Sequence, residues 1–137
     1  NESWVSLALH GLKHTSNYEC EKWTYEEMAY AATLPTVLEY FDKVFRAPGW
    51  QISNECYEFL YDNDWIVCDQ GYNDGRRPKN MKAWVNYDGV FKANGIEHPA
   101  YHGHVWDVGW NGIYEDYAKV EELAKETTEF HFIKELF

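Results

Sequence analysis

The chain has 137 residues and carries 23 acidic against 12 basic side chains, which gives a formal net charge of −11. This length fits one domain, so we expect residues 1–137 to form a single compact globular domain. The negative charge repels a phosphate backbone at long range, which argues against direct binding of nucleic acid. The same charge would attract a basic surface on another protein.

The three cysteines predict a reducing environment. Cys20, Cys56 and Cys68 cannot all pair within one chain, and their spacing matches no zinc-ligand pattern such as C-x-x-C. No apolar run approaches the length needed to cross a bilayer. We therefore expect a cytoplasmic protein that makes no membrane contact, and we expect no cofactor.

The N-terminal part is predicted to contain one strand and two helices that begin at capping residues. Residues 3–12 alternate between apolar and other side chains, which favours a short strand. Thr24 and Glu27 have the spacing of a capping box, so a helix is expected over about 24–32. Ser53 is a candidate cap for a shorter helix. Its inward-facing residues would be Cys56, Phe59 and Leu60.

Another helix is predicted between these two. Pro35 is tolerated in the first turn of a helix, and the helical pattern continues to about residue 46. The sequence Ala47-Pro48-Gly49 would end it. The residues expected on its buried face are Val37, Leu38, Phe41, Val44 and Phe45.

After residue 64 the sequence favours strands over helices. Strands are expected within 64–69, 81–89 and 90–93, the last of them bracketed by the turn dipeptides Asp88-Gly89 and Asn94-Gly95, which is typical of an antiparallel meander. A further strand is expected within 104–108 and a helix over 113–126, whereas 129–137 fits a strand or a helical tail. The predicted fold class is α+β, with N-terminal helices packed on a small antiparallel sheet of three to five strands and a C-terminal helix.

The stretch HPAYHGHVWDVGW, residues 98–110, is a candidate metal site. His102 and His104 would lie on the same side of a strand, and His98 or Asp107 would have to supply a third ligand. Asp107 is an odd number of residues from His104, so a regular strand turns it to the other face. The alternative is a tight turn with aromatic packing that neither binds a metal nor takes part in catalysis. If a metal binds here, the predicted activity is that of a metal-dependent hydrolase.

A second candidate site is the basic loop GYNDGRRPKNMK, residues 71–82. Its four cationic side chains could bind a phosphate or carboxylate, and a tryptophan could stack on the ligand. The cations are Arg76, Arg77, Lys79 and Lys82. The protein would then sequester a small anionic ligand, whereas the alternative is an ordinary solvated loop.

The acidic and aromatic residues predict a protein partner. Carboxylates on exposed helices can imitate the phosphate rows of a duplex and occupy the basic groove of a nuclease or defence protein. The candidate contact residues are Glu115, Asp116, Glu121, Glu122, Trp106 and Trp110. Because no catalytic motif is present, the sequence favours a non-catalytic inhibitor or immunity-type module over an enzyme. Such modules occur in phages and mobile elements, which is an association only.

Overall fold

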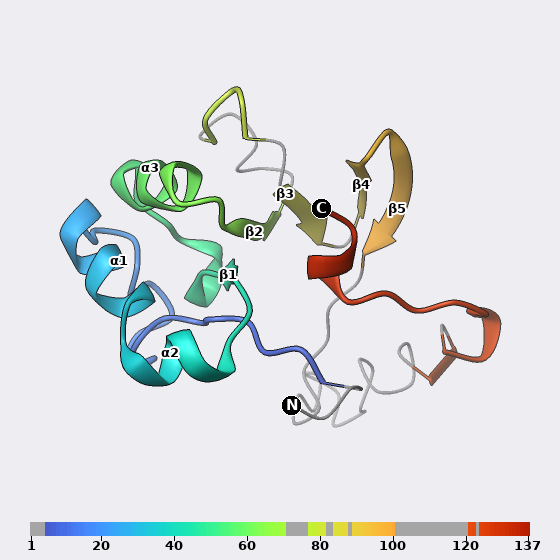
Figure 1. Cartoon of the computed structure of the whole chain (residues 1–137), viewed down its shortest axis with the longest axis horizontal. Coiled ribbons are helices and arrows are strands. Elements are labelled where there is room, and N and C mark those ends of the chain that lie inside the picture. The colour runs from blue at the N-terminus through green and yellow to red at the C-terminus, as the bar shows by residue number, and fades with distance from the viewer. Residues whose placement is uncertain (1–4, 71–76, 82–83, 88, 101–120, 123) are drawn as a thin grey trace, which may run out of the picture.

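The computed structural model describes residues 5–70, 77–81, 84–87, 89–100, 121–122 and 124–137 (Figure 1). Helices and strands are both present, which confirms the α+β composition. The helices are α1 (Tyr25–Ala32), α2 (Pro35–Tyr40) and α3 (Asn54–Asp62), with short 3-10 turns η1 (Pro48–Trp50) and η3 (Ile133–Glu135). The strands are β1 (Val44–Arg46), β2 (Ile66–Gln70), β3 (Trp84–Tyr87), β4 (Gly89–Ala93) and β5 (Ile96–Ala100).

The main sheet is parallel, so the predicted antiparallel sheet is wrong. Its order is β1-β2-β3, and both neighbouring pairs run in the same direction. Leu9 adds a fourth parallel segment: its N–H donates to the carbonyl of Val44 at 2.8 Å, and its own carbonyl accepts from the N–H of Arg46 at 3.0 Å. The physical reason is that α1 and α2, and then α3, each carry the chain back before the next strand, which is the crossover that parallel pairing requires.

Both faces of this sheet are covered, which explains the unbroken apolar runs in its strands. Phe45, Val67 and Trp84 face the cluster that includes residues of α1 and α3. The strand residues that point to the opposite face of the sheet belong to a second cluster, which also contains β4 residues and is flanked by the C-terminal segment (Figure 1). That set is Val44, Ile66, Cys68 and Val85.

The two capped helices are confirmed. Thr24 accepts from the N–H of Glu27, whose carboxylate accepts from the N–H of Thr24, so the capping box at the start of α1 is complete. Ser53 accepts from the N–H of Cys56 at the start of α3. In each case the local sequence supplies the partners for unpaired amides at the helix start.

The helix predicted through residue 46 ends at Tyr40 instead. Val44 and Phe45 belong to β1 and are buried between Leu9 and β2, whereas Leu38 is 67% exposed. A short apolar run fits either a helix or a strand, and pairing with neighbouring segments decided between them.

The turn Asn94-Gly95 is confirmed as the tip of an antiparallel hairpin. Both residues have positive φ, 51° and 81°, as a two-residue hairpin turn requires. The hairpin β4–β5 forms its own two-stranded sheet, so the predicted single meander is only partly correct. Residues 121–122 and 124–126 are helical, as expected, with Lys125 paired to Glu121 at 2.9 Å. The expected strand within 104–108 lies outside the described residues.

Asp42 joins the C-terminal segment to the rest of the structure, and this contact should depend on pH. Its carboxylate accepts from Ser6 at 2.6 Å and pairs with Lys134 at 2.9 Å. Burial by itself would raise the pKa of Asp42, but the hydrogen bonds from Ser6 and Lys134 outweigh it and lower that pKa below its ordinary value. A carboxyl whose folded pKa is lowered stabilises the fold above its unfolded pKa and loses this effect as the pH falls through the folded pKa.

Replacing Lys134 by methionine should therefore lower the free energy of unfolding at pH 7 by less than about 1 kcal/mol, because the ion pair is partly exposed. At an acidic pH at which Asp42 is protonated, the difference from the wild type should vanish. Urea unfolding at the two pH values measures it, with Lys125→Met as a control cation. A deficit that is equal at both pH values would contradict the assignment.

The three cysteines are buried free thiols. Burial raises the pKa of Cys20 and of Cys56, and nearby acidic side chains add to the effect. Only the thiolate reacts, and each unit by which the pKa rises lowers the thiolate fraction tenfold. In the native state, alkylation of Cys20 and Cys56 should therefore be more than about tenfold slower than that of free cysteine. Mass spectrometry after iodoacetamide treatment, with and without urea, checks this. Rapid native labelling of Cys20 or Cys56 would show that they are accessible.

Within the described ranges, no helix has the length and apolar character needed to cross a membrane.

Candidate functional site

Most of the predicted site residues lie outside the described part of the chain. Among the four predicted metal ligands only His98 is described: it lies in β5, and its ring stacks on Phe91 with the centroids 5.5 Å apart. The predicted residues that lie outside the description are His102, His104, Asp107, Arg76, Lys82, Glu115, Asp116, Trp106 and Trp110. Glu121 and Glu122 are exposed, as is Lys79. The guanidinium of Arg77 lies 4.5 Å from the centroid of the Trp84 ring.

The parallel sheet brings other polar residues to one edge. Strands that run in the same direction end at the same edge, and ligands of open parallel sheets are usually bound there. His10 directly follows the Leu9 segment, Arg46 is the last residue of β1, and Asp69 lies near the end of β2. We call this edge, with the loops that leave it, the carboxyl-edge site.

Two imidazoles lie together at this edge. The rings of His10 and His14 have centroids 4.9 Å apart and are inclined by 55°. Nδ1 of His10 lies 2.7 Å from the carbonyl oxygen of Arg46. Because a carbonyl only accepts, this bond places a ring hydrogen on Nδ1. A backbone partner that fixes the tautomer in this way is typical of metal-binding histidines.

The loop between the two histidines is held by the carboxylate of Glu19. This carboxylate accepts from the N–H groups of Leu12, Lys13 and His14 at 2.8 to 3.3 Å. His14 has a positive φ of 49°, which is uncommon for a residue other than glycine. The loop conformation is therefore stabilised by a specific acceptor, and its strain lies at the residue that carries the second imidazole.

A second strained turn follows β1 and packs against this loop. Gly49 and Trp50 in η1 both have positive φ, 58° and 61°. A side chain at Gly49 would overlap the carbonyl of Asn17, and one at Gly11 would lie 2.8 Å from Pro48. The guanidinium of Arg46 stacks over the Trp50 ring at 4.2 Å. The two loops thus support one another, and they hold a cation beside the histidine pair along the same edge.

Asp69 is the one buried charged residue in the part of the chain that the structure describes, with an exposed fraction of 2%. Its carboxylate accepts a hydrogen bond from the hydroxyl of Tyr57 and another from the N–H of Gln70 at 2.7 Å. Burying a carboxylate is costly unless hydrogen bonds compensate it, and such residues are enriched at functional sites. Its position places a buried carboxyl group near the edge that carries Arg46.

The described residues contain a pair of metal-ligating side chains here and no group of three or more. A catalytic zinc normally has three protein ligands and one water, so a complete centre needs one more ligand. Comparison with protein-family models, with curated proteins and with solved structures finds no match.

The sequence contained a signal for this pair that the predictions did not use. His10 and His14 have H-x-x-x-H spacing, begin where the predicted strand 3–12 ends, and enclose a glycine. The importance of that position emerges only once the strand is known to be parallel to β1, because parallel pairing places its end beside Arg46.

Proposed function

We propose that the protein is a metal-dependent hydrolase whose metal ion is bound by His10 and His14 at the carboxyl-edge site. The observation that carries the proposal is the pair of rings 4.9 Å apart, with the tautomer of His10 fixed by a backbone carbonyl. Two imidazole nitrogens that each lie about 2.0–2.1 Å from one ion bring their rings to about this separation. The sequence alone favoured a non-catalytic module; the histidine pair favours the hydrolase.

A complete centre would need a third ligand, which none of the described residues supplies. His102, His104 and Asp107 offer the donor types that zinc and related ions take. His98 is assigned no role here, because its ring packs on Phe91 in the hairpin.

A bound metal ion would supply an activated water, since coordination lowers the pKa of water to about 7. Such a water could act as a nucleophile toward a carbonyl or phosphoryl centre. Arg46 places a permanent cation at the same edge as the histidine pair. Tyr57 holds the buried Asp69 carboxylate through its hydroxyl, and this keeps the end of β2 in place.

The test is metal content and metal-dependent stability. Protein purified without chelator should contain a transition metal, and zinc, manganese or nickel should raise the melting temperature of the metal-free protein. Absence of bound metal together with no thermal shift for any of the three ions would refute the proposal.

A second candidate function rests on a different surface. Helices α1 and α3 lie side by side, with the N–H of Tyr25 donating to Glu55 at 3.2 Å. Neither helix contains a basic residue, and their exposed acids are Glu26, Glu27, Glu55, Glu58 and Asp62. Tyr30 is exposed on the same pair of helices. This surface supports the acidic inhibitor or immunity-type module that would occupy a basic protein; Glu121 and Glu122 are exposed in another part of the chain.

This second candidate predicts a salt-sensitive complex with a basic partner. Raising the salt concentration should weaken the complex because exposed charges are screened. Reversing the charge of Glu115, Asp116, Glu121 and Glu122 should weaken it further, as should reversing Glu55 and Glu58. Binding that survives both sets of reversals would rule out these acidic surfaces.

A further inference from the structure

We propose that Asn94, at the tip of the β4–β5 hairpin, is a site of spontaneous deamidation, and that its conversion to a carboxylate loosens the C-terminal segment (residues 132–137). Two observations carry the proposal. Asn94 and Gly95 form an exposed tight turn, and the side chain of Asn94 donates a hydrogen bond to the segment. Neither observation involves the histidine pair, so the proposal is independent of the hydrolase assignment.

Deamidation is a reaction between an asparagine side chain and the backbone nitrogen of the next residue. The nitrogen of Gly95 attacks Cγ of Asn94, the new N–Cγ bond closes a five-membered imide, and the Cγ–Nδ2 bond breaks. Nδ2 leaves as ammonia with the proton that the Gly95 nitrogen gives up. Water then opens the imide at one of its two carbonyls, which leaves aspartate or isoaspartate at residue 94.

The hairpin tip leaves the reacting groups open. Asn94 and Gly95 are both exposed, and nothing lies within 4 Å of a Cβ built on Gly95. Because glycine has no side chain, nothing on Gly95 itself obstructs the approach of its nitrogen to Cγ. Within the described residues, the Gly95 N–H makes no backbone hydrogen bond, since the β4–β5 ladder begins at the Ala93–Ile96 pair. The attacking nitrogen is therefore not engaged in the sheet.

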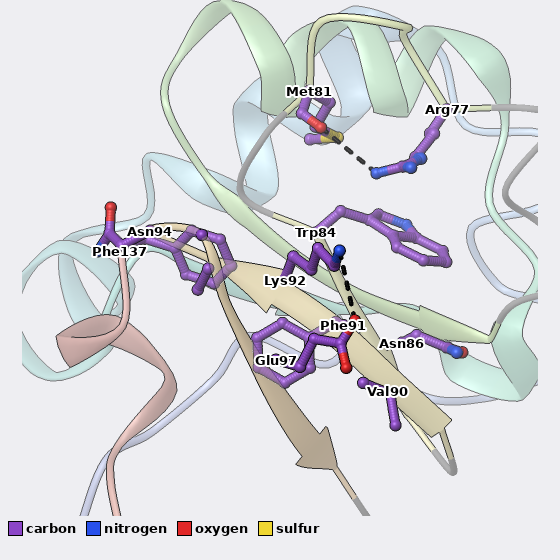
Figure 2. A pocket seen from close by; sticks show the side chains of 12 residues that line it. Arg77, Met81, Trp84, Asn86, Val90, Phe91, Lys92, Asn94, Glu97 and Phe137 are labelled. Carbon is purple, nitrogen blue, oxygen red and sulfur yellow. Dashed lines mark hydrogen bonds and ion pairs between the residues drawn. The ribbon is translucent and has the colours of Figure 1, made fainter.

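The amide group that this reaction removes holds the C-terminal segment. Nδ2 of Asn94 donates to the carbonyl oxygen of Leu136 at 2.9 Å. Asn94 and Phe137 also line one groove, together with residues of β3 and the hairpin (Figure 2). Deamidation places a carboxylate oxygen where the NH2 group was, and a carboxylate can only accept. A hydrogen bond would then be replaced by a repulsive contact between two acceptors.

The rest of the attachment of the segment is modest. Among the described residues, its backbone hydrogen bonds all lie within its own turn, η3. Its other polar link to the body of the structure there is the ion pair between Lys134 and Asp42. Ile133 and Leu136 are only partly buried against the second cluster. A segment held by few buried contacts opens at a low free-energy cost, so the loss of one hydrogen bond should be measurable.

Incubation of the native protein in a mildly alkaline buffer, followed by peptide mass spectrometry with fragmentation, tests the modification. Asn94 should deamidate several-fold faster than Asn17 and Asn80, which are exposed but precede larger residues. Gly95→Ala should slow the reaction several-fold, because a Cβ obstructs the attacking nitrogen. Fragmentation is needed because Asn111 is also followed by glycine. Equal rates at Asn94 and Asn80, or no slowing in Gly95→Ala, would overturn the assignment of the site.

Asn94→Asp tests the effect on the segment. Aspartate tolerates a positive φ in turns much as asparagine does, so this variant removes the donor and keeps the hairpin. Hydrogen exchange of the Glu135 and Leu136 amides should become at least about threefold faster, as the loss of one hydrogen bond predicts.

Asn80→Asp is the matched control, because it adds the same charge at an exposed position of the basic loop. It should change the exchange of the two amides by less than about twofold. Unchanged exchange in Asn94→Asp, or an equal increase in Asn80→Asp, would show that the Asn94 amide does not hold the segment. An equal acceleration in α1 would indicate global unfolding and would contradict the proposal as well.

Discussion

Replacing either His10 or His14 by alanine should weaken zinc binding by more than about 100-fold and abolish any metal-dependent hydrolysis. Changes to the outer partners of metal ligands already cost about 10- to 100-fold in affinity, and the loss of a direct ligand costs more. The expectation rests on the two adjacent rings and on the hydrogen bond from His10 to the carbonyl of Arg46. Titration calorimetry with zinc on the metal-free protein measures the change.

Two other histidines make this experiment decisive. His131 is partly exposed and pairs with Glu129 at 3.2 Å, so His131→Ala should leave zinc binding unchanged and controls for weak binding to surface imidazoles. His98→Ala separates the two metal-site hypotheses, because His98 was one of the ligands predicted from residues 98–107. If His98→Ala abolishes zinc binding while His10→Ala and His14→Ala do not, the metal site lies in that stretch and the His10–His14 assignment is wrong.

Replacing Gly49 by alanine should lower the free energy of unfolding by at least about 3 kcal/mol. Gly49 has a φ of 58°, and a left-handed conformation costs about 1–2 kcal/mol in a residue with a side chain. Its Cβ would also overlap the backbone carbonyl of Asn17, and forced overlap adds about 1–3 kcal/mol. Because this turn holds Arg46 and Trp50 against the histidine loop, the same variant should weaken zinc binding.

Gly95→Ala is the matched control for backbone strain. Gly95 has a φ of 81°, but nothing lies within 4 Å of a Cβ built there. This variant should therefore show only the conformational cost, about 1–2 kcal/mol, and should leave zinc binding unchanged. Urea unfolding of both variants measures the difference. If Gly49→Ala is no less stable than Gly95→Ala, the close contact between the two loops is not present in solution.

The local elements of this protein could be predicted where the residues themselves satisfy the backbone. Thr24 with Glu27, and Ser53, supply hydrogen-bond acceptors at helix starts, and Asn94-Gly95 tolerates the positive φ of a tight hairpin. These signals act over three or four residues and need no distant partner. The pattern of expected helices and strands also predicted the α+β class correctly.

The direction of the sheet could not be predicted in this way. A strand has the same local sequence whether its neighbour runs parallel or antiparallel, and Val44 and Phe45 fit the spacing of a helix as well as that of a strand. Their pairing with Leu9 and with β2 decided both questions. The sequence singled out the basic loop as a candidate anion site, but only the fold placed Arg77 on the Trp84 ring.

The sequence by itself determined the helix starts, the hairpin turn, the acidic charge and the types of side chain available for chemistry, because each depends on a residue and its near neighbours. The tertiary structure alone decided which of those side chains meet. His10 gained its importance from parallel pairing, which sets the end of its segment beside Arg46 at the end of β1. The physical reason is that a site is a set of distances between residues far apart in the chain, and those distances follow from how the strands pair.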